Sequence, residues 1–93
     1  MRVEWDERKN RTNHRKHGVR FELAQEAFDD PLALSKLDRV EAGEERWHTL
    51  GMVEGVLLLL VTHTVRDDHG EEVIRIISAR KATAHERRHY EQA

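Results

Sequence analysis

Three arginines in the second half of the chain are the residues best placed to do chemistry. Arg66 and Arg75 belong to two segments rich in β-branched residues, which the turn-forming run Asp67–Gly70 joins, and Arg80 follows shortly after. If this four-residue loop closes a hairpin, Arg66 faces Glu71. Because side chains alternate between faces along a strand, Arg66 and Arg75 are then expected on one face of a sheet, with Arg80 just past its end.

Two guanidinium groups on one sheet face predict an anion-binding site. Each guanidinium offers a planar fork of N–H donors that fits phosphate oxygens, and it stays charged at any working pH. Such donors would stabilise the negative charge of a pentavalent phosphorane. The spacing leaves open a second interpretation, in which the arginines only form surface ion pairs with acidic neighbours. Those neighbours are Glu71, Glu72 and Glu86.

The seven histidines raise the question of a metal site. His85 and His89 are one helical turn apart, and with Glu86 they match the His-Glu-x-x-His pattern of zinc peptidases. Two arginines lie inside this pattern, no histidine or cysteine follows it, and 93 residues leave little room for a protease cleft. We therefore expect neither a metal nor another cofactor.

Two further histidines, His17 and His63, are candidates for proton transfer because imidazole titrates near neutral pH. Strand alternation places His63 on the face opposite Arg66, so His17 is preferred. His17 stands beside Lys16 in a basic group around Gly18. This group is expected either to contact the phosphates of a nucleic acid or only to complement the dipole at the end of a helix.

The composition fits one small domain spanning residues 1–93. The chain has no cysteine, which excludes disulfides, thiolate nucleophiles and cysteine metal clusters. The longest apolar run, Val56–Val61, is far shorter than the ~20 residues that span a bilayer. The first residues are charged and do not resemble an export signal. We therefore expect a cytoplasmic protein that does not bind a membrane.

The net charge of -2 hides an uneven distribution of charge. Residues 1–20 have seven basic and three acidic side chains, whereas residues 21–45 have two basic and eight acidic ones. In residues 71–93, four of the five basic side chains follow Ser78. A fold that brings the two ends of the chain together would form a basic surface.

Residue patterns predict an α+β domain in which an antiparallel β-meander follows two helices and precedes a third. Asp6 is a suitable N-cap for a polar helix that ends at Gly18, and a short helix with an apolar stripe follows until Asp29–Pro31 stops it. Thr83 begins a capping box for the last helix, which should extend towards Glu91.

Strands are expected at residues 1–5, as an edge strand, and at residues 32–40, 46–53, 55–66 and 72–79. Turn-forming residues separate the last four segments, which predicts three consecutive hairpins. The leucine run of the 55–66 segment lacks polar alternation, which favours a central strand covered on both faces.

An ordered set of motifs along nearly the whole chain resembles the BrnT toxin family. The most specific blocks are Lys16–Val19 (Lys-His-Gly-Val) and Arg75–Arg80 (Arg-Ile-Ile-Ser-Ala-Arg). Other matching positions are Trp5-Asp6-Glu7 with Lys9, Phe21-Glu22 with Ala24, Phe28 with Asp30-Pro31, Gly43-Glu44 with Arg46, Lys81-Ala82, and Glu86 with Tyr90. The resemblance implies a small RelE-like fold and an endoribonuclease toxin that inhibits translation by cleaving RNA.

The resemblance also implies partners and site residues. It implies a type II toxin–antitoxin system, in which a BrnA-like antitoxin with a ribbon-helix-helix domain neutralises the toxin and contacts operator DNA. It favours Arg66, Arg75 and Arg80 as the residues that contact the phosphate, and it makes His17 a secondary catalytic candidate. It also implies secondary RNA-binding residues, namely Lys16, Arg46, Glu86 and Tyr90.

In the expected reaction, the RNA 2′-hydroxyl attacks the adjacent phosphate and leaves a 2′,3′-cyclic phosphate, without a metal or a covalent enzyme intermediate. DNA lacks this hydroxyl and should not react. The alternative is a non-catalytic module that binds a protein or a nucleic acid through the same basic surface.

Overall fold

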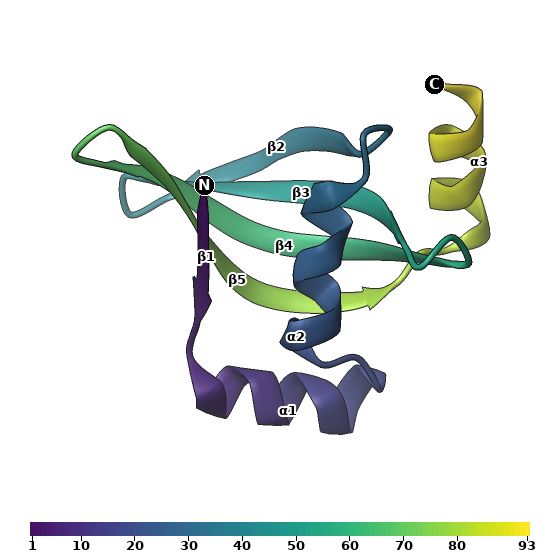
Figure 1. Ribbon diagram of the computed structural model, residues 1–93, viewed down its shortest axis with the longest axis horizontal. Coiled ribbons are helices and arrows are strands. Elements are labelled where there is room, and N and C mark those ends of the chain that lie inside the picture. Colours follow the sequence, from purple (N-terminus) through teal and green to yellow (C-terminus); the bar gives the residue numbers. More distant parts are fainter.

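A five-stranded sheet with the strand order β1-β5-β4-β3-β2 forms the centre of the molecule (Figure 1). The computed structural model describes all residues from Met1 to Ala93. The strands are β1 (Arg2–Trp5), β2 (Leu34–Glu41), β3 (Glu44–Val53), β4 (Leu57–Asp68) and β5 (Glu71–Lys81). β1 pairs with β5 in parallel, and the other neighbours form consecutive antiparallel hairpins. The structure confirms the α+β class, the meander and the central position of the leucine-rich strand.

Three helices and a 3-10 helix accompany the sheet. They are α1 (Glu7–His17), α2 (Phe21–Ala24), η1 (Gln25–Asp29) and α3 (Ala84–Gln92). The Asp6 carboxylate accepts hydrogen bonds from the N–H groups of Arg8 and Lys9, and Gly18 ends α1 at a φ of 72°. The segment expected as one short helix is divided into α2 and η1. None of the helices has the length and apolar character needed to cross a membrane.

The β4–β5 hairpin corrects the expected register. Its turn is the dipeptide His69–Gly70, with φ angles of 51° and 88°, which is the left-handed conformation of a two-residue hairpin turn. Asp68 therefore pairs with Glu71, where the sequence predicted Arg66 facing Glu71 across a four-residue loop. Because the shift is two residues, the alternation of side chains is preserved, and Arg66 still shares a face with Arg75.

A β-bulge in β5 decides on which face of the sheet Arg80 lies. The two neighbours of Ile77 pair with consecutive residues of β4, so Ile77 itself has no partner there. Strict alternation would put Arg75 and Arg80 on opposite faces, because they are an odd number of residues apart. The bulge changes this: Arg75 pairs with Thr64 and Arg80 with Leu60, and these two β4 residues point to the same face.

The two faces of the sheet are covered unequally. The helix face packs against α2 and η1, and α2 crosses in front of the sheet in Figure 1. Its core consists of Val19, Phe21, Ala24, Ala27, Val53, Leu59, Val61, Ile76 and Ala79. The open face, which includes Thr62, Thr64 and the three arginines, is covered only at one end, where α3 lies over Leu50, Leu58 and Leu60. The expectation that β4 is covered on both faces therefore holds only for the first half of the strand.

Two buried asparagines attach α1 to the rest of the fold. Ala79 lies beyond the segment Val73–Ile76 that pairs with β1, so the main chain of Ala79 has no strand neighbour on that side. The Asn13 side chain takes the place of a strand: its Nδ2 donates to the Ala79 oxygen at 2.8 Å, and its Oδ1 accepts from the Ala79 N–H at 3.0 Å. Asn10 likewise accepts from the Phe21 N–H at 2.8 Å.

We expect Asn13→Ala to lower the free energy of unfolding by about 2 to 4 kcal/mol, because it leaves buried main-chain groups without partners. Urea denaturation measures this change. Thr12→Ala is the control, since Thr12 is exposed on the same helix, and its effect should stay within about 0.5 kcal/mol. Equal stability of the two variants would contradict the anchoring role of Asn13.

Candidate functional site

Cross-strand pairing arranges the polar side chains of the open face in rows. The central row contains Arg46, Thr64, Arg75 and Glu4, on β3, β4, β5 and β1. The next row contains Lys36, His48, Thr62 and Ser78, and the row after it ends with Arg80. Neighbouring strands are about 4.8 Å apart, so the side chains of one row are within reach of each other. The structure therefore gathers four arginines on one face, as the sequence predicted for Arg66 and Arg75.

Arg66 and Arg75 converge on the carboxylate of Glu4. Arg75 Nη1 donates to Glu4 Oε2 at 2.9 Å, and Arg66 donates to the two Glu4 oxygens at 3.1 and 3.3 Å. These hydrogen bonds, first from Arg66 and then from Arg75, lower the pKa of Glu4 to about 2, so it stays ionised at neutral pH. Sequence reasoning missed Glu4, because its position depends on the parallel pairing of the first and last strands.

Arg80 forms a two-pronged ion pair with Glu86, at the start of α3. The Nη1–Oε1 and Nη2–Oε2 distances are 2.8 and 2.9 Å. Hydrogen bonding to Arg80 lowers the pKa of Glu86 to about 2, and Glu86 also accepts the N–H of Thr83 in the capping box. The alternative that the arginines pair with acidic neighbours therefore holds for Arg80. Glu71, by contrast, pairs with Arg2.

These ion pairs still leave donors for an external anion. A guanidinium has five N–H donors, and Arg75 uses one of them on Glu4. The side chains of Arg75 and Arg66 are 41% and 49% exposed. Pairs this exposed contribute little net stability, so a phosphate can join or displace the carboxylate at small cost. The carboxylates hold the guanidinium groups in place on the open face.

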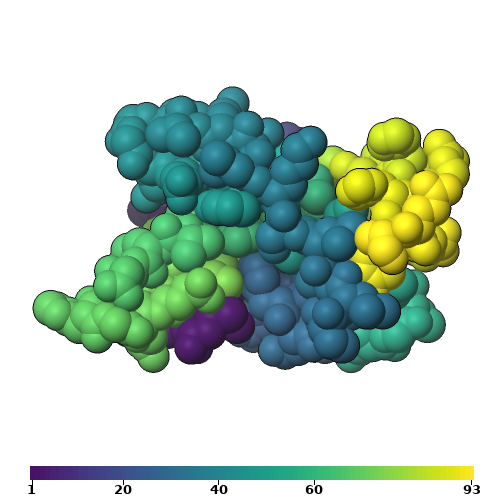
Figure 2. All heavy atoms as spheres, turned by 90° about the horizontal axis from the view of Figure 1, so that it is seen from above, coloured from purple at the N-terminus to yellow at the C-terminus, as the bar shows by residue number.

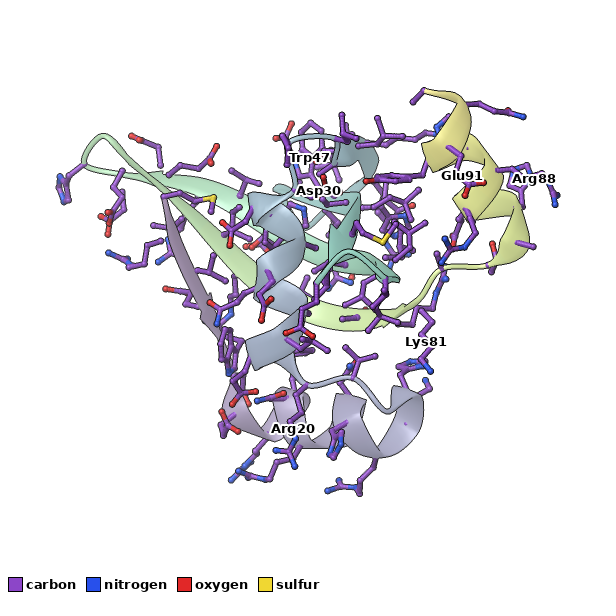
Figure 3. The ribbon with its side chains drawn as sticks, turned by 45° about the vertical axis from the view of Figure 1, so that its right-hand side comes forward. Arg20, Asp30, Trp47, Lys81, Arg88 and Glu91 are labelled. Atoms are coloured by element: carbon purple, nitrogen blue, oxygen red, sulfur yellow. The ribbon has the colours of Figure 1, made fainter.

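The other residues singled out from the sequence occupy different places. Tyr90 donates its hydroxyl to Asp30 at 2.6 Å, a hydrogen bond that raises the pKa of Tyr90 and ties α3 to the end of η1. Lys16 and His17 end α1, and neither forms a hydrogen bond or ion pair with the arginines. Figure 3 shows Arg20 beside α1, whereas Arg88 and Glu91 are on α3 at another corner of the molecule.

His63 is buried on the helix face, as expected from its position in the strand. Its Nε2 is 2.7 Å from Thr49 Oγ1, which is in turn 2.7 Å from Ser35 Oγ. The rings of Phe28 and His63 pack in a T-shaped arrangement, with a centroid distance of 4.9 Å. Burial lowers the pKa of His63 to about 4, so its ring is neutral near pH 7 and faces away from the arginines.

A hollow of about 520 Å³ lies beside His63 on the helix face. Trp47 lines it, and the indole N–H of Trp47 is buried without a hydrogen-bond partner.

In Figure 2 the green β4–β5 hairpin and the yellow α3 lie at opposite ends of the molecule. No group of three or more His, Cys, Asp or Glu side chains is arranged to hold a metal ion.

The fold and the open face define a small α+β protein that gathers four arginines on one face of its sheet. Residues 5–86 match the family model described as "Ribonuclease toxin, BrnT, of type II toxin-antitoxin system", and the chain belongs to this family. The crystal structure of the Brucella abortus ribonuclease toxin BrnT is similar, with a TM-score of 0.63 and 30% sequence identity. The similarity covers 89% of this chain and 97% of that one. The comparison with curated proteins finds no match.

The buried position of His63 predicts a pH dependence of stability. Between pH 6.5 and about 4, the unfolded chain binds a proton at His63 and the folded protein does not. The free energy of unfolding should therefore fall as the pH is lowered through this window, by up to about 3 kcal/mol. Urea denaturation from about pH 7 to about pH 4.5 measures it, above the range in which Glu4 and Glu86 titrate.

His63→Gln should remove most of this slope, because glutamine does not titrate. His69→Asn is the matched control: its side chain is 99% exposed, and asparagine tolerates the positive φ of the turn. The control should keep the slope of the wild-type protein. An identical slope in His63→Gln would show that another group causes the pH dependence.

Proposed function

We propose that this chain is a metal-independent endoribonuclease, the toxin of a type II toxin–antitoxin system, which inhibits translation by cleaving RNA. The observation that supports this proposal most strongly is the row of Arg46, Thr64 and Arg75 across the open face, with Arg66 and Arg80 on either side of it. Family membership supports a ribonuclease toxin in general. The arginines of the open face support this surface as the place of the reaction.

In the proposed reaction the substrate provides its own nucleophile. The 2′-hydroxyl oxygen bonds to phosphorus, the bond from phosphorus to the 5′-oxygen breaks, and a 2′,3′-cyclic phosphate remains. Arg66, Arg75 and Arg80 stabilise the charge on the phosphorane oxygens, since guanidinium groups held in advance need no reorganisation during the reaction. DNA is inert in this scheme because it lacks the attacking hydroxyl.

The spacing of the arginines suits a strand of RNA. The partners of Arg75 and Arg80 on β4 are four residues apart, which is about 13 Å along the strand. A scissile phosphate between them lies within reach of both guanidinium groups when the long side chains extend towards it. Arg46 extends the row of donors across β3, while Lys16 and His17 would contact RNA that continues past the sheet. Glu86 and Tyr90 border the face by holding α3 in place.

A non-catalytic binding module is the second candidate. The ion pairs of Arg75 and Arg80 favour it, because paired arginines are also typical of surfaces that only bind. Cleavage of protein-free RNA in EDTA by the purified protein separates the two candidates. A binding module retains RNA in a gel-shift assay and leaves it intact.

We further propose that a BrnA-like antitoxin with a ribbon-helix-helix domain neutralises this toxin in the cytoplasm. Operator DNA would be contacted only through the antitoxin. The acidic segment 21–45 and the basic open face together favour a partner of mixed charge.

Arg75→Ala should lower the rate of RNA cleavage by at least ~100-fold, because the loss of one fixed donor costs a few kcal/mol in the transition state. We expect a similar loss for Arg80→Ala. Arg8→Ala is the matched control, since Arg8 is exposed on α1, and it should cleave RNA at the wild-type rate. A folded Arg75→Ala protein with the wild-type rate would remove Arg75 from the mechanism.

The complex with the antitoxin should bury well over ~1,200 Å² and should weaken only moderately with salt, because apolar anchors determine how slowly a stable complex dissociates. Calorimetric titration at low and high ionic strength measures this dependence. A steep loss of affinity with added salt would mean that charge alone holds the two proteins together.

A further inference from the structure

Three histidines line a groove between the open face and α3. His48 reaches the groove from β3, and His85 and His89, one helical turn apart, reach it from α3. The groove has a volume of about 420 Å³, which lies in the range of sites that bind small molecules. The His48 side chain is 36% exposed, and the other two histidines are exposed. Unlike the buried His63, all three can exchange protons with a substrate.

The His48 wall of the groove lies between Arg75 and Arg80 along the sheet. His48 belongs to the row that separates the row of Arg75 from the row of Arg80. At the other wall, Glu86 lines the groove and holds Arg80 in its two-pronged ion pair. This ion pair fixes the first turn of α3, which includes His85, next to Arg80. An RNA strand that extends from Arg75 to Arg80 would therefore pass beside the row of His48 and approach the first turn of α3.

We propose that His48 and His85 are the proton-transfer residues of the RNA cleavage. This assignment rests on the proposed function, and it differs from the sequence-based choice of His17. One of the two histidines, in its neutral form, takes the proton of the 2′-hydroxyl as the oxygen bonds to phosphorus. The other, as imidazolium, gives its proton to the 5′-oxygen as the bond from phosphorus breaks. The two histidines finish with exchanged protonation, and no proton is consumed.

Charged groups of both signs face these histidines. Asp38 Oδ2 is 3.7 Å from His48 Nε2, and Lys36 is paired with His48 across β2 and β3. Glu86 lines the groove from α3, and Arg80 on β5 pairs with it.

The test is the pH profile of cleavage by the full-length protein, measured on a short RNA in EDTA from about pH 5 to about pH 9. The wild-type profile should be bell-shaped, because one histidine must be neutral and the other protonated. His48→Gln and His85→Gln should each slow cleavage by at least ~100-fold and each remove one limb of the bell. Both positions are at least partly exposed, so the melting temperature should hardly change. The exposed His69→Asn should keep the wild-type profile.

A second substrate identifies the acid. With sulfur in place of the 5′-oxygen, the leaving group is a thiolate and needs no proton, so the variant that lacks the acid should regain most of its rate. The variant that lacks the base should stay slow. A merely structural role for either histidine would not produce this difference.

The outcomes distinguish the inference from the proposed function. If both histidine variants cleave at the wild-type rate with an intact bell, or if only His17→Gln loses a limb, the inference is overturned. The proposed function then stands as long as Arg75→Ala is inactive. If the wild-type protein leaves RNA intact, the proposed function fails, and this inference fails with it.

Discussion

The bulge at Ile77 is the constraint on which the rest of this structure depends. Before it, β5 presents Arg75 to the open face; after it, β5 presents Ala79 to the helix face and Arg80 to the open face. A regular strand would reverse the last two. Ala79 would then lose its place in the core, and the Arg80 guanidinium would be driven among apolar side chains. One unpaired residue thus serves both the packing of α1 and the grouping of the arginines.

Ion pairing lets a chain with a net charge of -2 hold four arginines together on one face of the sheet. Hydrogen bonds from the arginines lower the pKa values of Glu4 and Glu86 to about 2, so both carboxylates stay ionised beside them. They order the guanidinium groups and limit the repulsion among them, yet they remain at a solvated surface that substrate oxygens can reach. Apolar side chains fill the opposite face, so the ordering of the arginines does not require a buried charge.

Local signals in the sequence predicted much of this fold. Asp6 and Gly18 bound α1 as expected, and strand alternation placed Arg66 and Arg75 together and His63 apart from them. The predicted length of the turn between β4 and β5 was wrong, because Asp67 and Asp68 favour turns as strongly as the residues after them. Only their pairing with β5 shows that they extend β4.

Contacts between residues far apart in the chain could not be predicted from local sequence patterns. The main chain of Ala79, two residues after the bulge, pairs with the Asn13 side chain, 66 residues away. The place of Glu4 depends on a parallel strand pair that joins the two ends of the domain. The groove of His48 and His85 forms only when α3 docks on the sheet, and periodicity along the chain does not reveal where a helix docks.

The central claim is that RNA binds and reacts on the open face of the sheet. The most direct measurement is NMR of the protein with an RNA analogue that has one 2′-deoxynucleotide at the cleavage position, because it can bind and cannot react. The side-chain methyl signals of Thr62 and Thr64 should shift on binding, while those of Leu59 and Val61 on the helix face stay in place. Shifts confined to α1, α2 and the helix face would contradict it.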